Sequence, residues 1–106
     1  GVDFEEVKRF KKLKQTFLSK YFSKNEIIYC NKRNNPEQSF CTRFCAKEAF
    51  FKAFNEEKVI DFKKLEVVND DDGKPYFFYQ NKKLDKVHLS LSHTKAYAIA
   101  FVVIED

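Results

Sequence analysis

One group of residues that could do chemistry lies in the stretch Phe40 to Phe54, FCTRFCAKEAFFKAF. Its apolar positions cover nearly the whole circumference of a helix, which is typical of a buried helix, yet Glu48 lies in the middle of it. Desolvating a carboxylate is costly unless a cation lies opposite. Three partners stay open: Lys52 one turn further on, another basic side chain, or a metal ion. A structural Glu48–Lys52 ion pair is the usual result of this spacing.

A second group of reactive side chains falls in the run HLSLSHT, residues 88–94. Its histidine and serines alternate onto one side of an expected strand, and His93 and Thr94 stand at the strand end. A serine hydrolase is disfavoured, because the chain has no G-x-S-x-G motif and no glycine-rich oxyanion loop. His93, Thr94 and Lys95 could instead bind a phosphate group through charge-assisted hydrogen bonds. Local hydrogen bonding of the histidine is the structural alternative.

Nucleotide-binding and zinc motifs are absent: the sequence has no P-loop, no G-x-G-x-x-G and no zinc-ligand spacing. Two carboxylates far apart in the chain remain, Asp3 and Glu48, with Lys52 and His93. Two carboxylates together with phosphate oxygens and waters commonly hold Mg²⁺. Asp3 also has a structural interpretation, because Glu6 follows it at the spacing of a helix capping box.

The helices that must position these residues are expected at residues 7–22, 27–29 and 36–54. The first is amphipathic, with lysines on its outer faces. Ser23 and Glu26 form a capping-box pattern before the second. Asn35 as N-cap and Pro36 at the first helical position open the long central helix, and Asn55 ends it.

The strands are expected at residues 65–69, 75–79, 87–92 and 98–104. The first two flank Asp70-Asp71-Asp72-Gly73, a hairpin turn in which Gly73 supplies the positive φ. A calcium loop is disfavoured because the alternating ligands and the distal Glu are missing, so the turn is interpreted as solvated. The last strand is nearly continuous in apolar residues and should be central. We expect one domain over residues 1–106, an α+β fold with a small antiparallel sheet packed on the long central helix.

Composition indicates a globular chain with an uneven charge. Of 106 residues 43% are hydrophobic and 17% aromatic, which excludes a disordered protein. Residues 1–52 carry twelve Lys/Arg and six Asp/Glu, whereas residues 53–106 carry eight and ten. The basic half should face an acidic partner, if it is not only a solvating surface. The odd number of cysteines, Cys30, Cys41 and Cys45, argues for reduced packing residues.

No apolar run of 18 residues and no signal peptide occurs, so a soluble chain is expected. The chain begins at Gly1 without Met, which leaves room for a removed leader. The excess of Lys, Asn, Phe, Ile and Tyr suits AT-rich codons. A bacterial cytoplasm is the simple expectation, and a plastid-type organelle of bacterial descent is the alternative.

Five stretches together resemble one family. They are GVDF (1–4), RFCAKEAFFKAF (43–54), LEVVND with DGKP (65–75), HLSLSHT (88–94) and AYAIAFVVIE (96–105). In this order, over nearly the whole chain, they resemble the holo-acyl-carrier-protein synthases, the small bacterial-type class of the 4′-phosphopantetheinyl transferase superfamily. The resemblance implies Mg²⁺-dependent transfer of 4′-phosphopantetheine from coenzyme A to a serine of apo acyl carrier protein, a step that serves fatty acid biosynthesis. The other product is 3′,5′-ADP.

The resemblance also implies roles for individual residues. Asp3 and Glu48 fall on the family's metal ligands, and Glu48 and Lys52 on its catalytic residues. Coenzyme A would be bound by Lys52, Gly73, Pro75, His93 and Thr94. The acidic carrier protein would dock on Arg9, Phe17, Arg43 and Phe44. The family forms homotrimers with active sites at subunit interfaces, and neither nucleic acid nor a membrane is implied as a partner.

Two other functions remain open. The chain could be a non-catalytic basic α+β module that binds RNA or an acidic protein through its lysine-rich helix and aromatic side chains. Such a module would need no metal and would leave Glu48 in its apolar helix unexplained. The chain could also be an inactive relative that only binds coenzyme A.

Overall fold

The structure is a computed structural model that describes residues 1–54 and 60–106. Its elements in chain order are β1 (Val2–Glu6), the 3₁₀ helix η1 (Val7–Phe10), α1 (Gln15–Tyr21), α2 (Lys24–Asn31), α3 (Pro36–Ala53), the 3₁₀ helix η2 (Phe62–Lys64), β2 (Glu66–Asn69), β3 (Pro75–Tyr79), β4 (Lys82–Lys83), β5 (Val87–His93) and β6 (Tyr97–Ile104). The fold is α+β, as expected.

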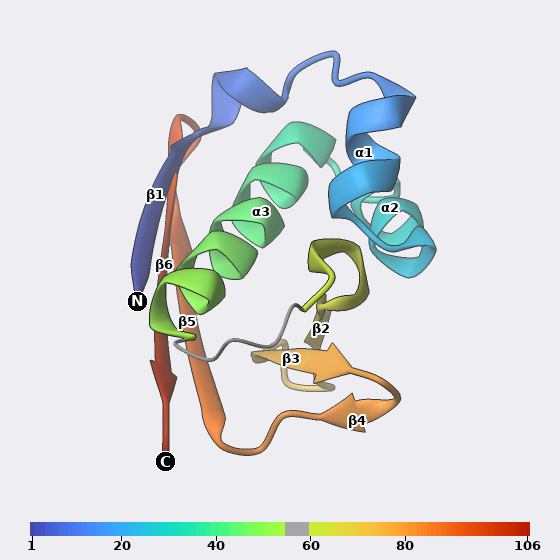
Figure 1. Ribbon diagram of the computed structural model, residues 1–106. Helices are drawn as coiled ribbons and strands as arrows, with labels where there is room; N and C mark the ends of the chain where they lie inside the picture. The colour runs from blue at the N-terminus through green and yellow to red at the C-terminus, as the bar shows by residue number, and fades with distance from the viewer. Residues whose placement is uncertain (55–59) are drawn as a thin grey trace.

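The strands form two small antiparallel sheets (Figure 1). The larger has the order β1-β6-β5, so the last strand is central, as its apolar sequence predicts. The smaller has the order β2-β3-β4. The predicted hairpin between β2 and β3 is confirmed, and Gly73 in its turn has φ +84°. Asp70 accepts hydrogen bonds from the backbone N–H groups of Asp72 and Lys74, which stabilises the turn.

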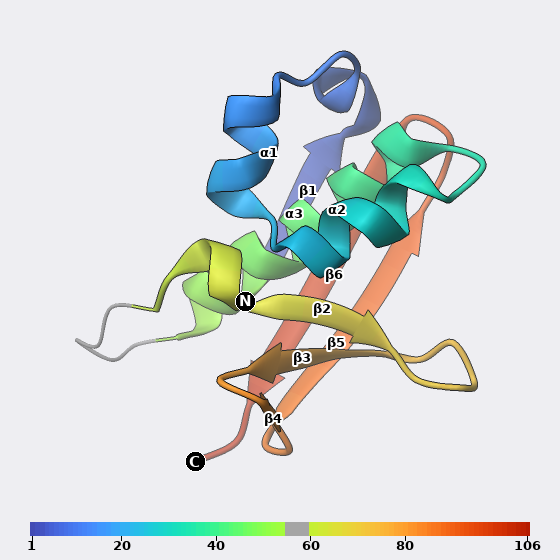
Figure 2. The same cartoon turned by 90° about the vertical axis from the view of Figure 1, so that its right-hand side faces the viewer.

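The long helix α3 lies across the inner face of the β1-β6-β5 sheet, and α1, α2 and the smaller sheet cover its other side (Figures 1 and 2). Small residues make this close packing possible. Ala98 and Ala100 of β6 and Ala46 and Ala49 of α3 are all almost completely buried. The Asn35 cap and Pro36 at the helix start are confirmed. The predicted end at Asn55 lies outside the described residues.

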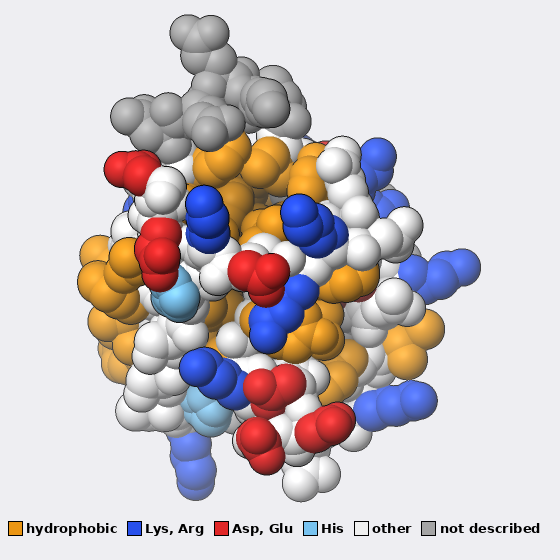
Figure 3. Space-filling model, turned by 90° about the horizontal axis from the view of Figure 1, so that it is seen from below, with side chains coloured by type: hydrophobic (Ala, Val, Ile, Leu, Met, Phe, Trp, Pro, Cys, Tyr) orange, Lys and Arg blue, Asp and Glu red, His pale blue; other side chains and the backbone are white. Residues whose placement is uncertain are grey.

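The outer face of the same sheet is apolar but exposed. The side chains of β6 alternate, so that every second residue points away from α3. The exposed apolar residues of this face are Val2, Phe4, Tyr97, Ile99, Phe101 and Val103. In Figure 3, hydrophobic side chains gather along the edge of the molecule that belongs to this sheet. A surface of this kind usually marks a protein interface.

The predicted helix over residues 7–22 is wrong in its first half. Val7–Phe10 form a 3₁₀ helix, the chain then turns through Lys12 at φ 55°, and α1 begins only at Gln15. The capping interpretation of Asp3 is also wrong, because Asp3 lies inside β1. Its strand pairs with β6, and this long-range pairing outweighs the local capping pattern. The short strand β4 was not predicted.

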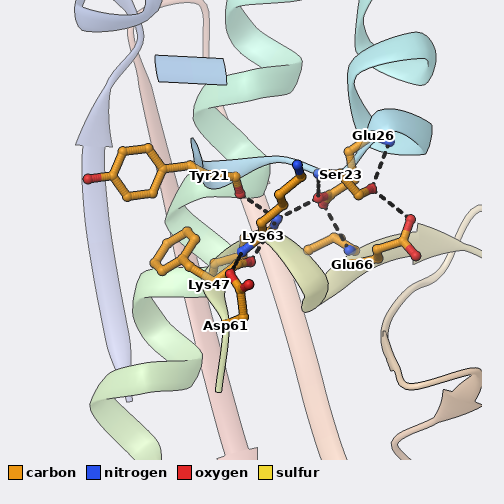
Figure 4. Close-up of polar contacts among 9 residues, drawn as sticks. Tyr21, Ser23, Glu26, Lys47, Asp61, Lys63 and Glu66 are labelled. Carbon is orange, nitrogen blue, oxygen red and sulfur yellow. Dashed lines mark hydrogen bonds and ion pairs between the residues drawn. The ribbon is translucent and has the colours of Figure 1, made fainter. Parts of the chain in front are cut away.

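A buried ion pair joins α3 to the second layer of the molecule (Figure 4). Lys47 is completely buried, and its Nζ lies 2.5 Å from Glu26 Oε1 and 2.8 Å from the carbonyl oxygen of Tyr21. Glu26 also accepts from the backbone N–H of Val67 and from that of Ser23, which confirms the predicted capping box. This network ties α1, α2 and β2 to one point on α3.

The three cysteines are free and buried, as expected of packing residues. Burial raises the pKa of the Cys30 and Cys41 thiols to about 12. None of the helices over the described residues is both long and apolar enough to cross a membrane.

Candidate functional site

An acidic cluster lies between β1 and α3. Asp3 and Glu5 are two residues apart on β1, so both point from the strand toward α3, and both are more than nine-tenths buried. Glu48 and Lys52 approach from α3. Lys52 Nζ lies 2.8 Å from Asp3 Oδ1. Lys52 thus pairs with Asp3, and within the described parts of the chain the Glu48–Lys52 ion pair expected from the spacing does not form.

Only one of the two carboxylate oxygens of Asp3 has a hydrogen-bond partner. Its Oδ1 accepts from Lys52, but its Oδ2 is buried without a hydrogen-bond partner. Buried carboxylate oxygens normally have partners, so an orphaned one marks a place where a ligand can bind. Gly1 brings β1 close enough to α3 for this arrangement: a Cβ added there would lie 2.2 Å from the carbonyl oxygen of Ala49.

The two glutamates of this cluster have raised pKa values. Burial, then the adjacent Asp3 carboxylate, raises the pKa of Glu5 to about 7. Burial and the charge of Asp3 also raise the pKa of Glu48, against an opposing effect of Lys52. The hydrogen bond to Asp3 raises the pKa of Lys52, which keeps this lysine charged. The cluster has an excess of negative charge that a bound cation would neutralise.

A divalent cation fits the donor set at this position. Asp3 and Glu48 supply hard carboxylate oxygens, and one of them is the unpartnered Asp3 Oδ2. Within residues 1–54 and 60–106, no three or more His, Cys, Asp or Glu side chains converge as a complete metal site. Mg²⁺ commonly uses one or two carboxylates together with substrate phosphates and waters, so two protein ligands are enough.

A polar basin of about 550 Å³ opens on the other flank of α3. It is lined by His93 from the end of β5, Gly73 and Pro75 from the hairpin, and Arg43 from α3. Lys32 and Arg33 add positive charge at its rim. Three of the predicted coenzyme A residues therefore lie together in one cavity of anion-binding character.

Arg43 belongs to this basin. It is 6% exposed, its guanidinium lies 4.1 Å from the centre of the Tyr29 ring, and its Nη2 donates to Asn69 Oδ1 at 2.8 Å. Its Nε is buried without a partner. Arg43 was predicted to dock the carrier protein together with Arg9; Arg43 lines this basin, whereas Arg9 pairs with Glu5.

Thr94 has a local role in the turn between β5 and β6. Its Oγ1 accepts hydrogen bonds from the backbone N–H groups of Ala96 and Tyr97. Its carbonyl oxygen accepts from Gln38 Nε2, which ties the turn to the start of α3. Thr94 thus shapes the loop beside His93, and its side chain does not line the basin.

The remaining docking residues lie on an aromatic surface beside η1 and α1. The rings of Phe17 and Phe44 are 6.2 Å apart, and Phe10 packs on both. Arg9 stands next to Phe10 with its side chain 64% exposed. A positive charge beside half-buried aromatic rings suits an acidic partner with some apolar surface.

Helix α3 separates the acidic cluster from the basin. In the sheet register Glu5 pairs with Ala98, and Ala98 pairs with His93, so α3 passes over Ala98 with a carboxylate on one flank and the histidine on the other. On α3 itself, Arg43 and Lys52 are nine residues apart, about 180° around the helix. One chain therefore does not gather all the predicted site residues into a single pocket.

The sequence pattern did not predict several residues of the two sites. The alternation Asp3-Phe4-Glu5 is a strand pattern that would have placed Glu5 beside Asp3, but it is too short to distinguish from a helix start. Tyr29 and Asn69 hold Arg43 through contacts between distant segments, and nothing in the local sequence indicates them.

The fold and these two sites define a small α+β protein whose acidic pair and basic basin suit a phosphorylated ligand with a metal ion. Comparison with protein families is more specific. The family model described as the 4′-phosphopantetheinyl transferase superfamily matches residues 1–102. The chain therefore belongs to this superfamily, as the sequence motifs indicated.

Curated relatives match nearly the full length of the chain. It is 41% identical over 110 residues to the holo-[acyl-carrier-protein] synthase of Thermodesulfovibrio yellowstonii, covering 98% of this chain and 95% of the relative. It is 36% identical over 115 residues to the enzyme of the same name from Chloroherpeton thalassium, covering 99% and 95%.

Solved structures show the same fold. The holo-(acyl-carrier-protein) synthase of Bacillus anthracis, in complex with CoA (3′,5′-ADP), has a TM-score of 0.81 at 34% identity, covering 98% of this chain and 92% of that one. The holo-[acyl-carrier-protein] synthase of Neisseria meningitidis has a TM-score of 0.84 at 29% identity, covering 100% and 96%.

Proposed function

We propose that this chain transfers the 4′-phosphopantetheine group of coenzyme A to a serine of apo acyl carrier protein, and so releases 3′,5′-ADP. The single observation that carries this proposal is the buried, unpartnered Asp3 Oδ2 beside Glu48 and Lys52, in a chain of this superfamily. Relatives that match nearly its whole length are named for this reaction.

In this reaction the serine oxygen forms a bond to the phosphorus that carries the pantetheine arm. The bond between that phosphorus and the bridging oxygen breaks, and its electron pair leaves with 3′,5′-ADP. We assign the acceptance of the serine proton to Glu48, and the raised pKa that burial and Asp3 give this carboxylate supports its role as the base. Lys52 remains charged and neutralises phosphate oxygens.

Mg²⁺ is the cofactor that we propose for the acidic cluster. Asp3 and Glu48 would hold it, as the unpartnered oxygen and the hard carboxylate donors suggest. When bound, the ion would supply positive charge to the pyrophosphate oxygens of coenzyme A. Without a cation, the mutual repulsion of the carboxylates would disfavour binding of a polyanionic substrate.

The basin is the place that we propose for the nucleotide end of coenzyme A. His93, Arg43 and the rim residue Arg33 offer hydrogen-bond donors to phosphate oxygens. Gly73 and Pro75 form its wall, and Thr94 orders the loop that carries His93. We propose this role for Arg43 because its guanidinium is buried against Tyr29 at the basin, and the docking role expected from the sequence stays a prediction.

The acidic carrier protein would dock on the aromatic surface beside η1 and α1. Phe17 and Phe44 provide its apolar centre, and Arg9 provides an exposed charge at its rim. Rim charges of this kind raise the association rate more than the final affinity.

A homotrimer is the assembly that we propose. The acidic cluster and the basin lie on opposite flanks of α3, which favours a complete site that combines the cluster of one copy with the basin of a neighbouring copy. The exposed apolar face of the β1-β6-β5 sheet supplies the surface for such contacts. The relatives reported above are bacterial, and we propose the cytoplasm of a bacterial-type cell as the compartment.

Mass spectrometry of an apo acyl carrier protein tests this function. After incubation with this chain, coenzyme A and Mg²⁺, we expect a mass gain of one phosphopantetheine, and EDTA should prevent it. Binding of coenzyme A without any mass gain would identify an inactive relative. Salt-sensitive binding to RNA, with no mass gain and no binding of coenzyme A, would instead favour the non-catalytic module.

A further inference from the structure

Glu5 links the acidic cluster to the surface of the protein. Its carboxylate is buried beside Asp3, and on the other side its Oε1 accepts a hydrogen bond from Arg9 Nη1 at 2.6 Å. Only 9% of the Glu5 side chain is exposed, against 64% of that of Arg9. One carboxylate thus lies between a candidate cation site and an exposed arginine.

The carboxylates of Asp3, Glu5 and Glu48 are not all paired with a cation. Lys52 compensates Asp3, and Arg9 compensates Glu5, whereas Glu48 has no ion pair within the described parts of the chain. The buried Asp3 Oδ2, also without a partner, indicates where a cation would complete the set. If Arg9 left Glu5, a buried negative charge would remain beside the cation site, and such a charge is strongly unfavourable until a cation compensates it.

We propose that Glu5 is a positioning residue that couples the cation site to the docking surface, with Arg9 as an exchangeable counter-ion. An acidic partner that pairs with Arg9 withdraws it from Glu5, and the uncompensated charge of Glu5 then strengthens cation binding. The coupling is reciprocal, so a bound cation also favours release of Arg9 to the partner. The identity of the partner rests on the proposed function, whereas the coupling itself is a property of this chain.

Glu5 acts here through its charge. Among the described residues Glu5 does not converge with Asp3 and Glu48 as a three-ligand metal site, so we place it beside the cation site and not among its ligands. Its position beside Asp3 is enough, because neighbouring charges interact strongly in a partly buried site.

A double-mutant cycle measured on the metal-free chain tests the coupling. Electron paramagnetic resonance would give the Kd of Mn²⁺, which favours the same carboxylate donors as Mg²⁺. The variants are Arg9→Gln, Glu5→Gln and the two combined, all measured in the same buffer, so that the Arg9–Glu5 contact is the only feature compared. We expect Arg9→Gln to tighten Mn²⁺ binding by about fivefold or more, and to have no effect once Glu5 is already Gln.

Glu6→Gln is the matched control. Glu6 is the next residue of β1 and pairs with Lys8 near the surface. Its replacement by Gln removes the same charge as Glu5→Gln. Its Mn²⁺ affinity should stay within twofold of the wild type, while Glu5→Gln weakens binding by about fivefold. Circular dichroism would confirm that each variant is folded, so that a loss of affinity reports the site.

An Arg9→Gln effect of equal size with and without Glu5 would overturn the coupling, as would no effect on the Kd in any variant. A second arm adds an apo carrier protein whose acceptor serine is replaced by alanine. The carrier should tighten Mn²⁺ binding to the wild type and not to Glu5→Gln, and equal tightening of both would contradict the proposal. Absence of transfer activity with an intact cycle would count against the proposed function alone.

Discussion

Glu5 shows how one buried side chain can make stability depend on pH. Its pKa is raised from 4.5 to about 7, by burial first and then by Asp3. Below about pH 4.5 it is protonated in both states. Between pH 4.5 and 7 the unfolded chain releases this proton while the folded chain retains it, so the folded state loses stability as the pH rises.

Glu5→Gln should therefore gain stability relative to the wild type as the pH rises. We expect about 1 kcal/mol between about pH 5 and pH 8, discounted for solvent screening near the surface. Urea unfolding at both pH values would measure it, with Glu6→Gln as the control. A stability difference that does not change with pH would show that the carboxylate is not perturbed.

Arg9 and Arg43 should affect different substrates. Arg43→Ala should raise the KM for coenzyme A by about tenfold or more, because it removes a charged donor from the basin. Arg9→Ala should mainly raise the KM for the carrier protein, because Arg9 is exposed beside Phe10. Steady-state kinetics with each substrate varied would separate the two. An Arg43→Ala defect confined to the carrier protein would restore the docking role expected from the sequence.

At the scale of residues, the sequence predicted that Asp3, Glu48 and Lys52 belong to one site but did not predict the contacts among them. Asp3, Glu48 and Lys52 do come together, but Lys52 pairs with Asp3 and not with Glu48. Spacing along one helix predicts neighbours on that helix only. The competing partner comes from a strand 49 residues away, and no local pattern reports such a contact.

Among the elements, α3 is held in place by Lys47. Burial lowers the pKa of Lys47, and the Glu26 carboxylate opposes this effect. Lys47→Met would leave Glu26 buried without its counter-ion, and we expect a loss of about 3–5 kcal/mol in the free energy of unfolding. Urea denaturation would measure it. The double variant Lys47→Met/Glu26→Gln should recover part of the loss, and a single-variant loss below about 1 kcal/mol would contradict this role.

The elements most faithfully predicted are those with strong local signals. Asn35 with Pro36 and the capping box of Ser23 with Glu26 are satisfied within one helical turn. The start of the chain was mispredicted because the same residues fit two structures. Val7 and Phe10 have helical spacing, but β1 pairs with β6 and takes the preceding residues into the sheet. Only the tertiary pairing decides between the two.

For the whole molecule, the exposed face of the β1-β6-β5 sheet predicts assembly. Phe101 lies on the central strand and is 54% exposed. Phe101→Asp should leave the chain folded, because the side chain packs on nothing inside, but should give monomers with transfer activity reduced by about 100-fold or more. Light scattering after gel filtration would report the mass.

Ile28→Asp is the control for assembly. Ile28 is also an exposed apolar residue, 48% exposed, but it lies on α2 away from the sheet face. It should keep the assembly and the activity of the wild type. A monomeric Phe101→Asp variant with full activity would show that one chain contains the complete site.

The proposed transfer is tested by following two products in one reaction: the mass of the carrier protein and the amount of 3′,5′-ADP. The wild type should add one phosphopantetheine per carrier and release 3′,5′-ADP in equal amount. Glu48→Gln should lower the rate by at least about 100-fold while remaining folded, whereas Glu37→Gln, in the first turn of the same helix, should not change it. Full activity of Glu48→Gln, or no transfer by the wild type, would contradict the account.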